Sequence, residues 1–148
     1  MDITIRESTP ADYPAIFSLI RELAIFERTP YKLTNSVEIM MKEQDFFHAF
    51  VAVNPDQEIV GYATYNFIFY TWVGKSIYMD DLYVRSDWRS HGIGTQLIDR
   101  VISFAKQTGC HKVRWQVSGW NAPAIAFYKK LGAVIDDVEK NCDLILSA

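Results

Sequence analysis

The hydrophobic pattern changes its period once in the middle of the chain, and this change restricts the possible folds. Three strand-like runs, 48–53, 58–69 and 75–84, are joined by short connections, and Asn54-Pro55-Asp56-Gln57 between the first two has the chemistry of a turn. In residues 92–106, apolar side chains recur at helical spacing instead. Sequential strands with short connections predict an antiparallel meander that leads into an amphipathic helix.

The flanking segments extend this core to an α+β pattern. The other expected elements are, in chain order, a strand at residues 3–5, a helix at 9–27, a shorter helix through 41 capped by Thr34 or Asn35, a strand at 112–117, a helix at 121–131 and a closing hairpin of 133–138 with 142–146. The order β-α-α-β-β-β-α-β-α-β-β predicts the α+β class with a mixed sheet. Antiparallel N-terminal strands are followed by a right-handed β-α-β crossover with a parallel central pair.

Size and composition restrict the class of protein. A length of 148 residues with 49% hydrophobic content predicts one domain, residues 1–148. The net charge of −3 argues against general nucleic-acid binding, which needs a basic face. Cys110 and Cys142 are too few for a disulfide framework and lack metal-ligand spacing, so we expect no metal and a reducing cytoplasm. The N-terminus lacks the order of a signal peptide, and the longest apolar stretch is far shorter than a membrane span.

The segment with the clearest chemistry joins the third strand-like run to the long helix. Gly92 and Gly94 stand one residue apart at the helix start, with Arg89 and His91 beside them. Glycines let a ligand approach the backbone closely, and a helix N-terminus attracts anions. We interpret the segment as a pyrophosphate-binding turn, although a Gly-x-Gly pair also fits a tight turn without a ligand. It is not a Walker loop, and Leu97 excludes the Gly-x-Gly-x-x-Gly pattern.

The same segment resembles a known family. Arg89-Ser90-His91-Gly92-Ile93-Gly94 is similar to the Arg/Gln-x-x-Gly-x-Gly/Ala signature of the GNAT acetyltransferase superfamily, which uses acetyl-CoA. More narrowly, the segments 77–84, 120–128 and 21–27 resemble the diamine branch, which contains the spermidine/spermine and thialysine N-acetyltransferases. The resemblance implies a GNAT-like fold, no metal, and a homodimer.

The resemblance also implies which residues bind the co-substrate. The strand Leu82 to Val84 would pair its backbone with the pantetheine arm, and the loop and helix start would surround the pyrophosphate. The full set expected to contact CoA is Leu82, Tyr83, Val84, Arg89, Ser90, His91, Gly92, Ile93, Gly94, Thr95 and Asn121. Asn121 also fits a plain helix N-cap, and the two roles are compatible.

Two residues match catalytic positions of the branch. Tyr128 matches the general acid that protonates the leaving thiolate, although its spacing alone fits a core aromatic beside Phe127 better. Asp80 stands where the branch carries a glutamate that helps to deprotonate the amine. Because aspartate is one methylene shorter, the resemblance leaves open whether an extra water bridges the gap or the base lies elsewhere.

Three further residues match positions that bind the amine substrate. Glu27 and Asp81 match acidic positions that hold an ammonium, and Trp72 matches an aromatic of the polyamine groove. Neighbours 80 and 81 face the same pocket only if a bulge interrupts the strand. Tyr70 replaces an acidic position of the polyamine-specific members, which argues against long polyamines.

The sequence therefore predicts an N-acetyltransferase that moves the acetyl group of acetyl-CoA to a primary amine of a small cationic substrate. The substrate would be a diamine, a polyamine or a thialysine- or lysine-like compound, with direct transfer in a ternary complex. One alternative keeps the enzyme class but assigns a protein N-terminus, a lysine side chain or an aminoglycoside as acceptor. A second alternative is a CoA-binding regulatory module without turnover.

Overall fold

The computed structural model describes residues 2–146 and divides the chain into two compact units, Met1–Gln116 and Val117–Ala148. The units are described separately. Within residues 2–146, no helix is both long and apolar enough to cross a membrane.

The first unit contains two sheets and three α-helices. Its elements are β1 (Thr4–Glu7), α1 (Tyr13–Phe26), α2 (Val37–Lys42), β2 (Ala49–Val53), β3 (Ile59–Thr64), β4 (Asn66–Tyr70), β5 (Gly74–Tyr78), β6 (Leu82–Val84), α3 (Ile93–Gln107) and β7 (Val113–Arg114). One sheet has the order β1-β2-β3-β6 with antiparallel pairs. The other has the order β4-β5-β7, in which β5 and β7 are parallel. The predicted α+β class, with antiparallel strands and one parallel pair, is confirmed.

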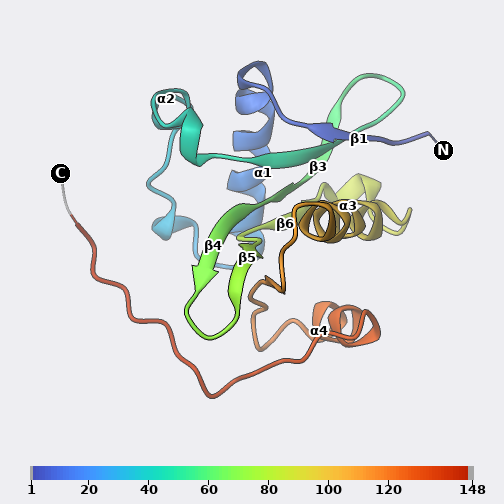
Figure 1. Cartoon of the computed structure of the whole chain (residues 1–148). Helices are drawn as coiled ribbons and strands as arrows, with labels where there is room; N and C mark the ends of the chain where they lie inside the picture. The colour runs from blue at the N-terminus through green and yellow to red at the C-terminus, as the bar shows by residue number, and fades with distance from the viewer. Residues whose placement is uncertain (1, 147–148) are drawn as a thin grey trace. The chain divides into compact units, whose positions relative to one another are not determined.

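Side-chain alternation in the first sheet explains why a helix covers each of its faces (Figure 1). Val51, Tyr62 and Tyr83 lie in one buried cluster with the apolar stripe of α1. The next side chain on β2, Phe50, points to the other face, where its ring lies 5.7 Å from that of Phe104 on α3. Since successive strand residues face opposite sides, each strand contributes to both cores.

The long hairpin predicted from runs 58–69 and 75–84 forms, but each of its strands is interrupted. The first run breaks at Tyr65 into β3 and β4, and the second breaks at residues 79–81 into β5 and β6. The expectation of two continuous strands is therefore wrong. The two strands nearer the turn, β4 and β5, form the second sheet with β7, whereas β3 and β6 belong to the first sheet.

A threonine hydroxyl holds the break between β5 and β6. Oγ1 of the buried Thr64 accepts the backbone N–H groups of Asp80 at 3.0 Å and Asp81 at 2.9 Å. The Thr64 N–H in turn donates to the Asp81 carbonyl at 3.0 Å. On the other side of the break, the Met79 N–H donates to the Arg114 carbonyl of β7 at 2.9 Å. The chain thus leaves one sheet and enters the other within three residues, as in a β-bulge.

Two smaller expectations are corrected. The cap of α2 is Ser36, whose hydroxyl accepts the Ile39 N–H, rather than Thr34 or Asn35, because α2 begins only at Val37. The strand expected at 112–117 is limited to β7, whose ladder with β5 covers only Val113 and Arg114.

The second unit contains the helix α4 (Ala122–Lys130) and a long C-terminal segment. Asn121 caps α4 and Gly132 follows it with φ of 94°, as predicted. The closing hairpin expected at 133–138 and 142–146 is wrong: neither run is a strand in the described part of the chain. Val134 and Leu144 are 93% and 86% exposed, so these apolar side chains are not packed, and apolar alternation alone does not form a strand.

We predict that Thr64→Val destabilises the protein by about 2–3 kcal/mol, because the isosteric side chain leaves two backbone donors without their acceptor. Thr64→Ser keeps the hydroxyl and is expected to cost less than about 1 kcal/mol. Urea unfolding of both variants measures the difference. Equal losses for valine and serine would contradict the role assigned to the hydroxyl.

Candidate active site

The outer edge of β6 is open, and its polar groups are arranged for pairing. The Arg85 N–H donates to the Val60 carbonyl at 2.8 Å, and the Asp81 carbonyl accepts from Thr64, so alternate residues bond to β3. In an antiparallel ladder the residues between them, Leu82 and Val84, direct their N–H and C=O groups the other way. No strand of the described residues pairs with that edge. An extended ligand with amide groups fits it as an added strand.

The loop after β6 leads into α3 through two left-handed residues. Ser90 has φ of 66°, and Gly92, the N-cap of α3, has φ of 75°. The first backbone bond into the helix runs from the Gln96 N–H to the Gly92 carbonyl at 3.1 Å. The preceding N–H groups of Ile93, Gly94 and Thr95 therefore have no intrahelical acceptor and mark the positive end of the helix dipole.

Neither the backbone conformation nor the packing at position 94 requires a glycine. Its backbone is helical, and the nearest atom to a Cβ added there, Cγ2 of Val84, lies at 3.9 Å, an ordinary contact. Glycine in a helix costs about 1 kcal/mol relative to alanine. Neither packing nor conformation explains a glycine here, and the absence of a side chain would let an anion approach the exposed N–H groups around it.

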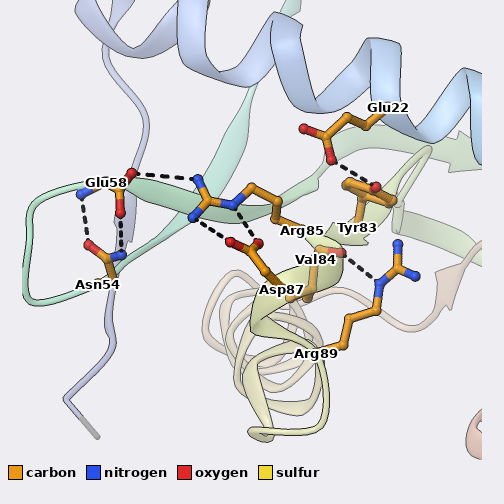
Figure 2. Close-up of polar contacts among 8 residues, drawn as sticks. All are labelled: Glu22, Asn54, Glu58, Tyr83, Val84, Arg85, Asp87 and Arg89. Atoms are coloured by element: carbon orange, nitrogen blue, oxygen red, sulfur yellow. Dashed lines mark hydrogen bonds and ion pairs between the residues drawn. The ribbon is translucent and has the colours of Figure 1, made fainter.

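Arg89 lies at the start of this loop (Figure 2). Its Nε donates to the Val84 carbonyl at 2.9 Å, and its guanidinium lies 5.2 Å from the ring centres of both Tyr83 and Phe26. These contacts fix the guanidinium beside the open edge of β6. His91 is exposed and its ring lies 6.0 Å from that of Trp88.

Three acidic residues expected at the amine site lie close to the bulge at residues 79–81. Asp81 accepts a hydrogen bond of 2.8 Å from the hydroxyl of buried Tyr62. Burial, followed by the charge of Asp80, raises the pKa of Asp81 to about 6, and Glu27 at the end of α1 contributes to the rise. Desolvation also raises the pKa of Asp80, whose side chain keeps part of its surface in solvent. The structure therefore brings together the three predicted acids Glu27, Asp80 and Asp81.

A depression of about 480 Å³ lies between α1 and the start of β3. Its charged side chains are paired with one another or with neighbours. Arg85 forms ion pairs with Asp87 at 2.7 Å and with Glu58 at 3.7 Å, while Glu22 accepts from the Tyr83 hydroxyl at 3.1 Å (Figure 2). With its charges compensated in this way, the depression offers little to a charged ligand.

Trp72 and Tyr128 lie in other parts of the chain. Trp72 is at the tip of the β4–β5 hairpin and is 98% exposed, on the rim of a smaller cavity of about 280 Å³. Tyr128 is the buried residue of α4, with its ring 5.4 Å from that of Phe127. Asn121 caps the same helix by accepting the Ala124 N–H at 3.3 Å. These two residues belong to the second unit, and their geometry is described within it alone.

Sequence reasoning missed the residues that hold the acids in place. Thr64 and Tyr62 carry no motif, and only their spacing of two residues on β3 indicates that they face the same side. It also missed Lys112 and Arg114, which line the cavity beside Trp72. Their alternation on the predicted strand 112–117 was the available signal.

Comparison with known proteins decides the family. A sequence model of the acetyltransferase (GNAT) family matches residues 13–133. The chain belongs to the GNAT acetyltransferase family. It is 38% identical over 140 residues to the thialysine N-epsilon-acetyltransferase of Mus musculus, covering 87% of this chain and 82% of that protein. It is therefore an acetyl-CoA-dependent N-acetyltransferase.

Two further similarities agree with this. The spermidine/spermine N(1)-acetyltransferase-like protein 1 of Homo sapiens is 29% identical over 140 residues, which cover 88% of this chain and 20% of that longer protein. The resemblance to the diamine branch is thus confirmed. A crystal structure of an aminoglycoside acetyltransferase from an uncultured soil metagenomic sample superimposes with a TM-score of 0.79 at 24% identity. It covers 98% of this chain and 97% of that one, and it confirms the fold.

We predict that stability falls as pH rises from about 4 to about 6, by about 2–3 kcal/mol for Asp81 alone. The pKa of Asp81 is higher in the folded chain than its ordinary value of 3.8, so in this window the folded form holds a proton that the unfolded form has lost. Asp81→Asn keeps an acceptor for Tyr62 and is expected to flatten this slope and to raise stability at pH 7.

Chemical unfolding at several pH values measures the slope. Asp99→Asn, which removes an exposed carboxylate from α3, is the matched control and is expected to leave the slope unchanged. An Asp81→Asn protein that is less stable than the wild type at pH 7 would contradict the prediction.

Proposed function

We propose that this acetyltransferase transfers the acetyl group of acetyl-CoA directly to a primary amine of a small substrate in a ternary complex. The main support for this proposal is the position of the open edge of β6. It runs from the acidic bulge at Asp80 and Asp81 to the N-terminus of α3, so one extended ligand reaches both ends.

The co-substrate is assigned along this edge. Leu82, Tyr83 and Val84 would hold the pantetheine arm, with the backbone groups of the first and third residues bonding to its amides. The segment Arg89 to Thr95 would bind the pyrophosphate through the N–H groups at the start of α3. Asn121 is assigned to CoA from the resemblance. Because the family model spans both compact units, we treat residues 1–148 as one acetyltransferase domain.

The acids are assigned to the amine. A primary amine with an ordinary pKa near 10 must lose a proton before it attacks, and Asp80 is the proposed acceptor, directly or through water. Its raised pKa brings it closer to that task than an ordinary aspartate. Glu27 and Asp81 would attract the ammonium form of the substrate. Acetyl-CoA supplies the activated acetyl group, and the hydroxyl of Tyr128 would donate the proton that the departing thiolate takes up.

The acceptor is assigned to the class of small amines on which relatives act. Thialysine, named for the relative of Mus musculus, carries a primary amine at the end of a flexible chain. An aromatic contact with Trp72 suits such a cation. We also propose that the protein is a homodimer, as the resemblance implies, and that it is cytoplasmic, in line with its cysteine content. Light scattering of the purified protein tests the oligomeric state.

The first test is release of CoA thiol from acetyl-CoA with a panel of amines. The panel contains short diamines, spermidine, thialysine, lysine, a peptide N-terminus and an aminoglycoside. Selective turnover of a short amine supports the proposal. Turnover only on the peptide or the aminoglycoside would move the acceptor to another class. Binding of acetyl-CoA with no turnover on any amine would indicate a regulatory module.

We predict that Tyr128→Phe lowers kcat by about 10²-fold or more while the KM for acetyl-CoA changes less than about threefold, because a lost general acid affects chemistry rather than binding. The adjacent Phe127→Leu is the control for packing in α4. A Tyr128→Phe enzyme with wild-type kcat would remove this residue from the mechanism.

We predict opposite effects of Gly94→Ala on stability and on binding. The helix is expected to gain about 0.5–1 kcal/mol, since the new methyl group has room and alanine favours helix. The KM for acetyl-CoA is expected to rise at least about tenfold, because the methyl group occupies the space of the ligand. Ser103→Ala, exposed on the same helix, is the control that leaves KM unchanged. An unchanged KM in Gly94→Ala would place the pyrophosphate elsewhere.

A further inference from the structure

One face of the second sheet carries a basic and aromatic cluster. Tyr78 and Arg114 are register partners on the parallel strands β5 and β7, so their side chains share a face. Tyr70 on β4 and Lys112 before β7 fall on the same face by alternation. The Nζ of Lys112 and the guanidinium carbon of Arg114 lie 4.4 Å and 4.5 Å from the centre of the Tyr70 ring.

Neither cation forms an ion pair with an acid among the described residues of the first unit. The ion pairs there join Arg6 to Asp12 and Arg85 to Glu58 and Asp87, and none involves Lys112 or Arg114. Two positive charges are thus held over one ring, at the edge of a cavity of about 280 Å³ that Thr71, Trp72 and Val73 complete. Like charges at short range repel each other, and an anion between them relieves the repulsion. The cluster, called here the Tyr70 cluster (Tyr70, Lys112 and Arg114), is therefore suited to an anion.

The Tyr70 cluster and the acidic bulge are parts of one surface. Asp80 follows Tyr78 by two residues, where β5 gives way to the bulge. Burial contributes most to the raised pKa of Tyr78, the charge of Asp80 raises it further, and Arg114 opposes the rise, so the carboxylate and the guanidinium both act on the Tyr78 hydroxyl. A surface with an acid at one end and two cations at the other, separated by an aromatic side chain, is complementary to a molecule with an ammonium and an anion at its ends.

The cluster is not placed to bind the phosphates of CoA. The hairpin tip with Trp72 precedes β5, whereas the start of α3 follows β6, so the two lie at opposite ends of the β5–β6 run. An anion at the Tyr70 cluster is thus a separate group, on the amine side of the bulge.

Resting on the proposed function, we infer that the acceptor is an amino acid with a distal primary amine, whose carboxylate binds Lys112 and Arg114 while the amine faces Asp80. Guanidinium and ammonium donors form charge-assisted hydrogen bonds with carboxylates, and these bonds fix orientation as well as affinity. A diamine or polyamine would instead present its second ammonium to two cations. The cluster therefore selects against polyamines and for the carboxylate.

Matched substrates test the inference directly. L-Lysine and 1,5-diaminopentane differ only by the carboxylate, and 6-aminohexanoate keeps the carboxylate but lacks the α-amine. We expect kcat/KM to be at least about tenfold higher for lysine than for the diamine. In the Lys112→Gln/Arg114→Gln enzyme, KM for lysine and 6-aminohexanoate is expected to rise about tenfold or more with little change in kcat, whereas kcat/KM for the diamine stays equal or rises. Lys75→Gln is the control, since Lys75 lies on the opposite face against Phe67.

The possible failures are distinguishable. A diamine turned over as well as lysine, or a double variant that loses both substrates equally, would overturn the inference and leave the acetyltransferase standing. Absence of turnover on every amine would contradict the proposed acceptor class. In that case calorimetric titration with lysine and 1,5-diaminopentane still decides: binding of lysine alone, abolished in the double variant, supports the carboxylate site, and absence of such binding overturns it.

Discussion

The Thr64 hydroxyl is the contact on which the arrangement of the site depends. By accepting the N–H groups of both Asp80 and Asp81, it takes the middle of a long strand out of the ladder. The strand then divides between two sheets, which leaves one edge of β6 without a partner strand in the described part of the chain. It also brings the side chains of two successive acids, Asp80 and Asp81, close together, whereas a regular strand would direct them to opposite faces. A backbone feature thus creates both the place for an extended ligand and the acidic end beside it.

Electrostatics distinguishes the two ends of the proposed amine surface. At the bulge, burial raises the pKa values of Asp80 and Asp81, and the charge of Asp80 raises that of Asp81 further, so an ammonium bound there would offset an unfavourable negative charge. At the hairpin, Lys112 and Arg114 face the same Tyr70 ring. In the depression beside α1, by contrast, Arg85 is paired with Asp87 and Glu58. Charges without an ion pair thus lie at both ends of the surface where a substrate is expected.

Sequence reasoning predicted the elements more reliably than their pairing. Helix ends with cap chemistry, such as Asn121 and Gly132, appear where expected because the signal is local. The break at residues 79–81 depends on a hydroxyl sixteen residues away, and no local pattern reveals it. The C-terminal hairpin was predicted wrongly for a related reason. Apolar alternation favours a strand, but a strand forms only where a neighbouring strand completes its hydrogen bonds. Among site residues, the family motif located Gly94, whereas Lys112 and Arg114 became visible only when the register of β7 was known.

Amide hydrogen exchange measures whether the open edge of β6 binds acetyl-CoA, as proposed. Without ligand, the Leu82 and Val84 amides are expected to exchange quickly, while the Arg85 amide, bonded to β3, is protected. Addition of acetyl-CoA is expected to slow exchange at Leu82 and Val84 specifically, with little change at Arg85. Exchange at Leu82 and Val84 that remains unchanged at saturating acetyl-CoA would contradict the account.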